Sequence, residues 1–296
     1  MGKKMVVISF DMETDIGSWT SEDCGVKEGT QEILRVLRNH DVKATFLFTG
    51  REAMNNPAVV KKVLFDGHEV GCHTMYHETV GEPIFDMPGA NFLLGNEIKS
   101  RLELATDTVE KVAGVRPVSF RAPRLFGSTT MVNCLEELGY TVDSSFPSYF
   151  YSRSFLPYKP SHEDWSKEGD MRILELPVFY DIDVQEDDEK HRSRDQWPML
   201  RIKGAECFSK LCNRMLRQVK DQNGNSVLCI YLHPWEFVEM PECILTNEAE
   251  IRFKPFLYQN SGVFTLRALD EFLGAMKIVG VQFTRMKDFA ALRCQP

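Results

Sequence analysis

The clearest pattern in the chain is a regular alternation of short apolar runs with longer amphipathic segments. Residues 5–10 form a near-continuous apolar run, which is typical of a strand buried on both faces, as in parallel sheets. Similar runs recur along the chain, separated by segments with apolar positions at helical spacing. The predicted strands are residues 5–10, 43–50, 68–72, 118–121, 140–143, 172–179, 227–232 and 281–284. The predicted helices are residues 28–39, 57–64, 96–113, 128–138, 206–220 and 266–276.

This alternation predicts an α/β fold, because parallel strands need crossover helices between them. A doubly wound sheet and a barrel would both satisfy the pattern. The alternation breaks between residues 144 and 204, where prolines, aromatics and an acidic run at residues 181–189 indicate long loops around a single strand. We therefore expect one domain of barrel size over residues 1–296, with a loop insertion at about residues 144–204 that decides substrate choice.

The composition is that of an ordinary globular protein, and its charge narrows the choice of partner. The 296 residues are 43% hydrophobic and 26% charged, which is enough for a well-buried core. The formal net charge is −8, without a run of Lys or Arg. This charge argues against nucleic acid or an anionic membrane as a partner, so we expect a neutral substrate.

The ends of the chain and its cysteines bear on the cellular compartment. The first predicted strand begins almost at the N-terminus, without the apolar region and cleavage site of a signal peptide. No segment has the roughly 18 continuous apolar residues of a transmembrane helix. The eight cysteines are irregularly spaced and fit free thiols better than disulfides. We therefore expect a cytoplasmic protein; the sequence does not indicate its oligomeric state.

Candidate catalytic residues collect at the ends of predicted strands. Four strand ends carry polar groups in otherwise apolar surroundings: Asp11 with Glu13, His73 with His77, Arg121, and His233. In barrels, catalytic side chains come from the C-terminal ends of several strands. The recurrence of polar groups at these positions therefore predicts an active site at that edge of the sheet.

His73 and His77 have the spacing of a metal-binding pair. On a helical turn, residues i and i+4 have Cβ atoms about 5–6 Å apart, so both imidazoles can reach one ion at about 2.0–2.1 Å. Two histidines and one carboxylate make a hydrolytic metal site that leaves a position open for water. The alternative is a pair of surface or capping histidines. Cys72 should point to the opposite face of its strand and is not expected to reach the metal.

The other strand-end residues could complete a hydrolytic site. A second carboxylate could remove a proton from the attacking water, Arg121 could keep that carboxylate ionised, and His233 could protonate the leaving group. Each has an ordinary structural alternative when taken singly: a solvated acidic loop, a surface ion pair or a core histidine. Their occurrence together favours a metal-dependent hydrolase.

Five short motifs resemble, in order, those of the polysaccharide deacetylase family, also called the NodB-homology or carbohydrate esterase family 4 group. The first is similar to the branch of the family that has Asp-x-Glu. The motifs are Ser9-Phe10-Asp11-Met12-Glu13, His73-Thr74-Met75-Tyr76-His77, Phe120-Arg121-Ala122-Pro123-Arg124, Asp143-Ser144-Ser145-Phe146 and Tyr231-Leu232-His233-Pro234-Trp235-Glu236-Phe237. The resemblance covers most of the chain and implies a distorted, TIM-like (β/α)7 barrel.

For the metal half of the site, the resemblance implies a catalytic base and three ligands. Asp11 would be the base, and Glu13, His73 and His77 would hold the metal. Met12 stands at the usual ligand position of the family, so Asp15 remains the alternative to Glu13.

For the rest of the site, the resemblance implies roles in orientation and substrate binding. Arg121 would orient the base, and the backbone N–H that follows Pro123, that of Arg124, would help to bind the oxyanion. Asp143 would orient His233, the general acid. In the last motif, Leu232 would line the acetyl pocket, while Trp235 could stack on a sugar ring or pack in the core.

The function implied is that of a metal-dependent carbohydrate N-deacetylase, a hydrolase of linear amides. The expected metal is Zn²⁺, with Co²⁺, Ni²⁺ or Mn²⁺ as alternatives, and the expected substrate is an N-acylated amino sugar, a glycan or a lipid-linked sugar. One alternative is a deformylase or small-amide hydrolase of the same superfamily. The other is a non-catalytic carbohydrate-binding protein, which the presence of Asp11 and His233 disfavours because binding needs neither a base nor an acid.

Overall fold

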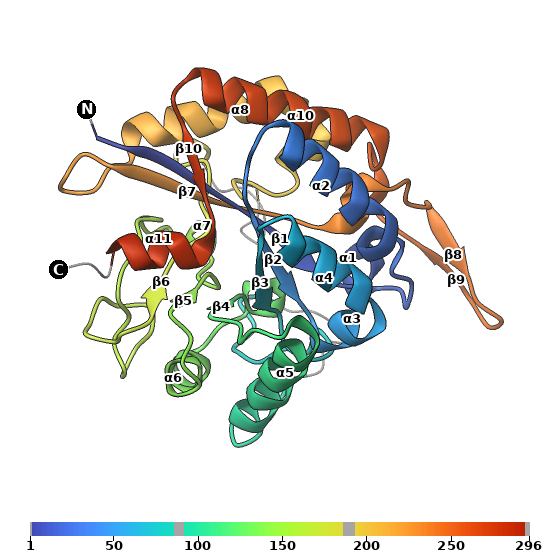
Figure 1. The fold of residues 1–296 in the computed structure, drawn as a ribbon, viewed down its shortest axis with the longest axis horizontal. Helices are drawn as coiled ribbons and strands as arrows, with labels where there is room; N and C mark the ends of the chain where they lie inside the picture. Colours follow the sequence, from blue (N-terminus) through green and yellow to red (C-terminus); the bar gives the residue numbers. More distant parts are fainter. Residues whose placement is uncertain (1, 86–91, 186–192, 294–296) are drawn as a thin grey trace.

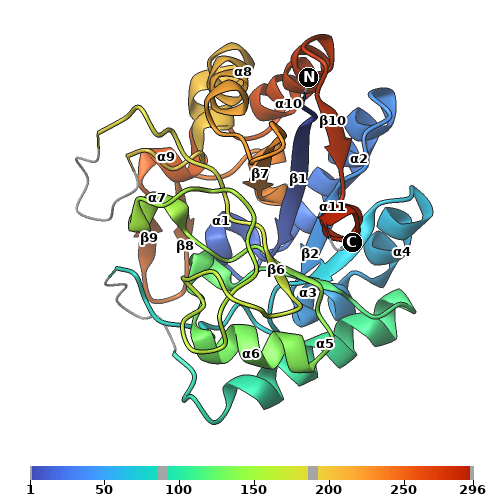
Figure 2. The same ribbon diagram turned by 90° about the vertical axis from the view of Figure 1, so that its left-hand side faces the viewer.

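A parallel sheet curls into a barrel at the centre of the protein (Figure 1, Figure 2). The computed structural model describes residues 2–85, 92–185 and 193–293. The strands of the sheet are β1 (Lys4–Met12), β2 (Thr45–Phe48), β3 (Glu69–Cys72), β4 (Ser119–Phe120), β5 (Val142–Asp143), β6 (Leu174–Glu175), β7 (Ser226–Leu232) and β10 (Gln282–Thr284).

The strand order is β10-β1-β2-β3-β4-β5-β6, and β7 also pairs with β1. Val178, just after β6, bridges in the parallel sense to Cys229 in β7, so the sheet curls round from β6 towards β7. β1 is the central strand, since it pairs with β10 near its start, with β2 near its end, and with β7 along most of its length. The expected (β/α)7 barrel is confirmed.

Helices surround the barrel, and α8 and α10 pack against each other along one side (Figure 1). The longer helices are α2 (Thr30–Asn39), α3 (Gly50–Asn55), α4 (Pro57–Phe65), α5 (Ile98–Ala113), α6 (Thr129–Glu137), α8 (Met199–Gln218), α10 (Val263–Ile278) and α11 (Met286–Arg293). Local sequence explains several of their ends. Ser128 caps α6 by accepting a hydrogen bond from the Met131 N–H at 3.2 Å. Gly114 ends α5 in the left-handed conformation, with φ of 74°, which glycine adopts without strain.

The alternation of side chains along the strands separates two hydrophobic cores. Met5 and Val7 belong to a core inside the barrel, whereas Val6, Ile8 and Phe10 belong to the core between the strands and the helices. The inner core also contains residues of α11, which lies across the end of the barrel where the strands begin. A residue just past the end of a strand that continues its inward-facing positions therefore points towards the barrel axis.

A buried carboxyl group attaches α11 to this end of the barrel. Glu69 Oε2 accepts hydrogen bonds from the Lys287 N–H at 3.1 Å and from Thr45 Oγ1 at 2.8 Å. Thr45 Oγ1 in turn accepts the Met286 N–H at 2.9 Å, and Glu69 Oε1 accepts the Ser119 hydroxyl. The first turn of α11 is thus capped by groups of the barrel, and the amino end of the barrel is closed.

Some elements differ from the sequence-based expectation. α8 begins at Met199, before the expected residue 206, and Gly204 breaks it with φ of 77° and ψ of 174°. α3, α11 and the hairpin β8 (Cys243–Leu245) and β9 (Glu250–Arg252) were not expected. The hairpin projects from the body of the molecule (Figure 1). Within the expected loop insertion lie the short helix α7 (Ser148–Tyr151) and strand β6, while residues 186–192 are outside the described part.

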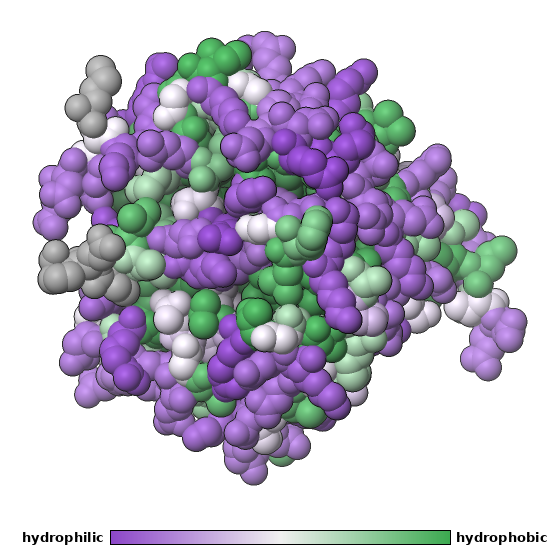
Figure 3. Space-filling model, in the orientation of Figure 1, coloured by the Kyte–Doolittle hydropathy of each residue, from purple (hydrophilic) through white to green (hydrophobic). Residues whose placement is uncertain are grey.

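The surface and the cysteines agree with the composition. The face seen in Figure 3 is mainly hydrophilic, with hydrophobic residues in scattered groups. Among the described residues, no helix has both the length and the apolar character needed to cross a membrane. The seven cysteines in the described part of the chain are free, as expected, and Cys294 lies outside it.

Candidate metal centre and active site

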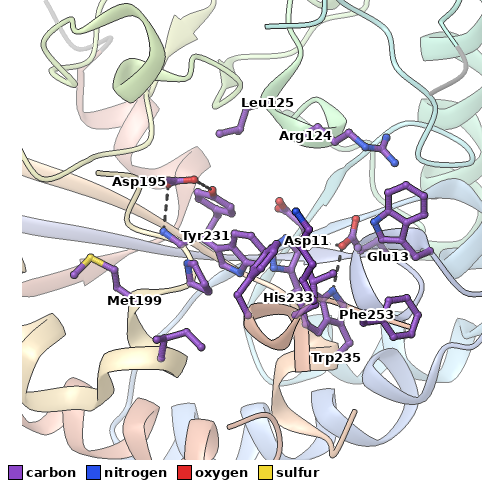
Figure 4. Close-up of a pocket in the computed structure, with 18 of the residues that line it drawn as sticks. Asp11, Glu13, Arg124, Leu125, Asp195, Met199, Tyr231, His233, Trp235 and Phe253 are labelled. Atoms are coloured by element: carbon purple, nitrogen blue, oxygen red, sulfur yellow. Dashed lines mark hydrogen bonds and ion pairs between the residues drawn. The ribbon is translucent and has the colours of Figure 1, made fainter. Parts of the chain in front are cut away.

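A cavity of about 930 Å³ opens at the carboxyl ends of the strands and contains the predicted site. Its lining includes Asp11, Glu13, His73, His77 and His233. Figure 4 shows Asp11, Glu13 and His233 together in the middle of the cavity. The structure therefore brings together residues from β1, the loop after β3, and the end of β7, as the predicted strand ends required.

Glu13, His73 and His77 form a cluster suited to a metal ion. One ligand atom from each lies within 4.8 Å of the others, and all three residues are buried. His77 Nε2 is 2.5 Å and His73 Nε2 is 3.9 Å from Glu13 Oε2. Two imidazole nitrogens and one carboxylate oxygen, gathered at this spacing and withdrawn from water, are a common ligand set of a catalytic divalent metal. The residues present therefore fit the expected metal.

The two histidines do not lie on a helical turn, contrary to the expectation from their spacing. Residues 73–77 form an irregular loop in which Thr74 and His77 have positive φ values of 63° and 60°. This loop brings the imidazole centroids to 5.1 Å from each other. Left-handed backbone at non-glycine residues carries strain and is concentrated at functional sites, so the convergence of the rings is specified by the loop rather than by helical periodicity.

Neighbouring groups fix the ligands in a metal-binding state. His73 Nδ1 donates a hydrogen bond of 2.7 Å to the Arg121 carbonyl oxygen, which leaves the lone pair of Nε2 facing the cluster. Burial lowers the pKa of His73 to about 4, so the ring is neutral near pH 7. Burial alone would raise the pKa of Glu13, but the charge and hydrogen bond of His77 outweigh it, so Glu13 is ionised. Trp235 Nε1 donates to Glu13 Oε1 at 3.2 Å.

The geometry selects Glu13 over Asp15 as the carboxylate of the cluster. Asp15 accepts hydrogen bonds from the N–H groups of Cys24 and Gly25, both at 2.9 Å, and so holds the loop before α2. Glu13 belongs to the inner row of β1 with Asp11, two positions earlier, whereas Met12 is in the outer core. An Asp-x-Glu sequence therefore places both carboxylates on one face of the strand. Cys72 also points into the outer core and does not join the cluster.

Asp11 and Arg121 form a buried ion pair beside the metal cluster. Arg121 Nη1 donates to Asp11 Oδ1 at 2.8 Å and to Ser9 Oγ at 2.7 Å. Its other donors contact Ser144 and Cys229, so the guanidinium is completely enclosed. No hydrogen bond to Asp11 Oδ2 occurs among the described residues, and Asp11 lines the cavity. One carboxylate oxygen is thus held while the other faces the space where a substrate would bind.

His233 is held by Glu236, a residue that the sequence reasoning did not single out. Glu236 Oε1 accepts hydrogen bonds from His233 Nδ1 at 3.0 Å and from the His233 backbone N–H at 2.9 Å. His233 Nε2 points the other way and lies 3.8 Å from Glu13 Oε1. Burial lowers the pKa of His233, but the hydrogen bond and charge of Glu236, with the charge of Glu13, outweigh it and raise the pKa above its ordinary value.

Hydrogen bonds from neighbouring side chains keep Glu236 ionised. Arg201 Nε donates to Glu236 Oε2 at 2.9 Å, and Trp197 Nε1 donates to Oε1 at 3.0 Å. Burial raises the pKa of Glu236, but the hydrogen bond of His233 and the charge of Arg201 bring it below its usual value. The signal in the sequence was the spacing His-x-x-Glu on a turn that starts with proline, η3 (Pro234–Phe237). Arg201 lies in the first turn of α8, before the predicted start of that helix at residue 206, and Trp197 lies just before α8, so their position could not be read from the sequence.

Asp143 does not orient His233, which corrects the expectation from the resemblance. Val142 is in the inner core and Ser144 contacts Arg121, so Asp143 points to the opposite side of β5. There it accepts the Ser145 hydroxyl at 2.5 Å and is paired with Glu175. Burial raises the pKa of Asp143 to about 6 and that of Glu175 well above its usual value. The two carboxyls therefore share a proton.

Two predicted substrate contacts are also corrected by the side-chain directions. Leu232 is in the outer core, and Tyr231, in the inner row with His233, lines the cavity instead. Trp235 lines the cavity but is completely buried, stacked on His233 at 5.3 Å and bonded to Glu13. It therefore supports the site rather than offering an open face to a sugar.

Pro123 and Arg124 form a tight turn, η2 (Pro123–Leu125), at the end of β4. Arg124 and Leu125 line the cavity, whereas Pro123 is buried beneath them. The role of the Arg124 N–H in binding an oxyanion stays a prediction, as do the catalytic roles of Asp11, Arg121 and His233.

Fold and site together define a class: a (β/α)7 barrel with a Glu-His-His cluster, an ion-paired aspartate and a carboxylate-bound histidine at the carboxyl ends of its strands. Residues 1–142 match the family model described as polysaccharide deacetylase. This match covers 142 of the 296 residues, the part that carries Asp11, Glu13, His73, His77 and Arg121, and it shows the resemblance to the polysaccharide deacetylase family for that part of the chain.

Individual relatives agree with this family. The chitooligosaccharide deacetylase of Azorhizobium caulinodans is 31% identical over 111 residues, which cover 37% of this chain and 48% of that protein. The peptidoglycan-N-acetylmuramic acid deacetylase of Bacillus subtilis is 26% identical over 147 residues, 49% of this chain and 50% of that protein. The chain thus spans about half the length of these curated relatives.

A solved structure from Mycobacterium smegmatis, described as that of a polysaccharide deacetylase, covers the whole chain. Its TM-score is 0.67 at 20% identity, over 100% of this chain and 93% of that one. At this identity the likeness shows a shared fold.

Proposed function

We propose that the protein is a metal-dependent hydrolase that removes an N-acyl group, most simply N-acetyl, from an amino sugar or a glycan precursor. The observation that carries the proposal is that one cavity holds the buried Glu13-His73-His77 cluster together with two further groups, the carboxylate of Asp11 and the imidazole of His233. Relatives named as deacetylases of chitooligosaccharides and of peptidoglycan support this reaction.

Zn²⁺ is the metal that we propose, because two histidines and one carboxylate are a common catalytic zinc set; Co²⁺, Ni²⁺ and Mn²⁺ are alternatives. Glu13, His73 and His77 would hold it. A divalent ion there would act as a Lewis acid on a carbonyl oxygen and lower the pKa of water from 15.7 towards about 7.

Asp11 is the group placed to accept the proton of the attacking water. Its Oδ1 is held by Arg121 at 2.8 Å, while Oδ2 faces the cavity. The guanidinium fixes the orientation of the carboxylate, so the free oxygen keeps a defined position at the cavity, where it could accept a proton. The Arg124 N–H would stabilise negative charge on the amide oxygen.

His233 is the group placed to protonate the departing amine. Nδ1 is occupied by Glu236, so the proton available to the substrate is on Nε2, which faces the cluster. As the C–N bond breaks, its electron pair takes this proton, and the products are a carboxylate and an amine. The water supplies the hydroxyl group of the carboxylic acid, which then ionises in solvent. The proton that the water leaves on Asp11 is released to solvent and His233 takes one up, which restores the starting charges.

The test is a metal and activity measurement on the wild type, Glu13→Ala and the control Asp15→Asn. We expect about one equivalent of divalent metal in the wild type and the control, and loss of metal and of amide hydrolysis in Glu13→Ala, assayed with N-acetyl and N-formyl amino sugars. A wild type that takes up no metal from Zn²⁺, Co²⁺, Ni²⁺ or Mn²⁺ would contradict the proposal. Cleavage of N-formyl sugars alone would move it to a deformylase.

We also propose that the protein works in a reducing compartment such as the cytoplasm. The support is that the described cysteines, including the exposed Cys24 and Cys207, are free thiols. Fractionation of the cells that make the protein tests this location.

A further inference from the structure

Arg124 is a cation in the cavity that has no ion-pair partner in the described part of the chain. Its guanidinium is partly buried and lines the cavity from η2. Within residues 2–85, 92–185 and 193–293, its side chain makes one long hydrogen bond, 3.5 Å from Nη1 to the His77 carbonyl oxygen. Among the described residues no carboxylate lies within ion-pair distance of it. A cation removed from water without a counter-ion is costly, so the missing partner is best sought in the ligand.

Arg124 lies next to the metal cluster. Its contact is with the backbone of His77, a residue of the metal cluster, and the negative charge of Glu13 acts on it. Figure 4 shows Arg124 and Leu125 on one side of the cavity, across from Met199. A group held by Arg124 would therefore lie beside the metal cluster, on the same substrate residue as the amide or on its immediate neighbour.

The backbone of Arg124 supports a functional role. It has φ of 59° and Leu125 has φ of 61°, a left-handed conformation that is unfavourable for residues other than glycine. The turn nevertheless presents a long charged side chain at this position. Strain of this kind persists where it places a group that function requires.

The charges around the cavity point the same way. Lys203 and Lys254 also line it and have no ion-pair partner among the described residues, whereas Arg252 is paired with Glu242 and Glu250. Asp11 is neutralised by Arg121, and Glu13 would be neutralised by a metal, which leaves Asp195 as one lining carboxylate against the three cations. The cavity of a chain with net charge −8 therefore carries an excess of positive charge, which attracts anions.

We propose that Arg124 binds an anionic group of the substrate, a carboxylate or a phosphate, next to the amide that is hydrolysed. The substrate class is then an N-acyl amino sugar that carries a negative charge, in place of the neutral sugar expected from the net charge of the chain. This inference rests on the proposed function. The planar guanidinium can hold either anion through two parallel hydrogen bonds.

The test compares three N-acetyl sugars on the metal-loaded protein: neutral N-acetylglucosamine, its 1-phosphate, and N-acetylmuramic acid, which carries a carboxylate. We expect kcat/KM for at least one anionic sugar to exceed that for the neutral sugar by about 10- to 100-fold, the range of a hydrogen-bonded charge pair. Arg124→Gln should abolish this preference by raising KM for the anionic sugar more than KM for the neutral sugar. Arg124→Lys should retain part of it, and Lys203→Gln, which removes another positive charge from the cavity lining, measures how much of the preference comes from the net charge of the cavity alone. Which anionic sugar is preferred distinguishes carboxylate from phosphate.

A binding experiment separates this inference from the proposed function. The same sugars are titrated calorimetrically into Asp11→Asn, with and without Arg124→Gln, so that turnover is not needed. Binding of an anionic sugar that requires Arg124 supports the subsite even if nothing is hydrolysed. Hydrolysis without preference for an anion overturns the subsite and leaves the proposed function standing. Equal loss for all three sugars in Arg124→Gln, or binding of none of them, overturns the subsite as well.

Discussion

Two buried carboxylate–guanidinium pairs flank the metal cluster, and they differ in how many oxygens the protein uses. In the Asp11–Arg121 pair, Oδ1 is bound and Oδ2 faces the cavity. In the Glu236–Arg201 pair, both oxygens are occupied, one by Arg201 and the other by His233 and Trp197. Both pairs join a carboxylate to a guanidinium, and they differ in the number of free acceptor oxygens. Asp11 has one and can react, whereas Glu236 has none and positions His233.

The guanidinium partners show the same division. Arg121 and Arg201 are completely buried and use their donors within the protein. Arg124, three residues after Arg121, has no such set of acceptors. Completed pairs thus build the site, and the incomplete groups, Asp11 Oδ2 and Arg124, are left for the reaction and its substrate. The predictions below test this division, from the largest expected effect to the smallest.

Asp11→Asn should abolish the reaction while leaving the metal cluster intact. The amide cannot accept the proton of water, and loss of a general base typically lowers the rate by about 10²–10⁴-fold. Steady-state hydrolysis and elemental analysis of the same preparation measure the two effects. Retained activity would assign the base elsewhere, and loss of metal would make Asp11 a fourth ligand.

Arg201→Met should destabilise the fold more than it impairs the metal cluster. Removing one partner of a buried pair leaves an uncompensated charge, which typically costs about 3–5 kcal/mol of unfolding free energy. Urea unfolding measures the change, and Arg217→Met, an exposed position on the same helix, is the control with an expected change within about 0.5 kcal/mol. A similar loss in both variants would mean that the Glu236–Arg201 pair has no special role.

Glu236→Gln should lower kcat by about 10- to 100-fold, as expected when a residue that orients a functional histidine is lost. It should also shift the basic limb of the pH profile to lower pH. Glu236 raises the pKa of His233, so removing its charge makes the general acid lose its proton at lower pH. The exposed Glu239→Gln is the control. A lower rate with an unchanged pH profile would indicate a structural role only.

Glu175→Gln should change the pH dependence of stability, because the Asp143–Glu175 pair has no guanidinium bonded to it. Burial raises the pKa of Glu175 well above its usual value, so the folded protein binds an extra proton and wild-type stability falls as pH rises above the ordinary carboxyl pKa. The variant should lose this fall between pH 5 and 8. Urea unfolding at both pH values measures it, with exposed Glu163→Gln as the control. Parallel pH dependence in all three proteins would exclude the shared proton.

Strand periodicity explains which parts of the fold and site could be predicted from the sequence. The apolar runs located β1, β2, β3 and β7 to within a few residues, and the polar groups at their ends do meet in one cavity. The misassigned roles fell on strand residues whose direction was not followed. Leu232 and Asp143 are adjacent to inward-pointing residues and therefore point outward. Counting alternate positions back from His233 would have found Tyr231.

Other features had no local signal in the sequence. The approach of His73 to His77 depends on two left-handed residues that are not glycine, and short-range periodicity does not predict these. Arg201, in the first turn of α8, and Trp197, just before it, reach Glu236 from residues that precede the predicted start of this helix. Glu236 itself was within reach, since a carboxylate three residues after a histidine on a turn can bond back to it.

The closure of the barrel by α11 makes the molecule a cup rather than a tube. Glu69 and Thr45 hold the base of this cup, while the loops that surround the cavity form a single rim. Substrate, water and both products must use that rim as their common passage. Because the base takes no part in substrate recognition, residues of the rim loops can change, and with them the substrate, without destabilising the barrel.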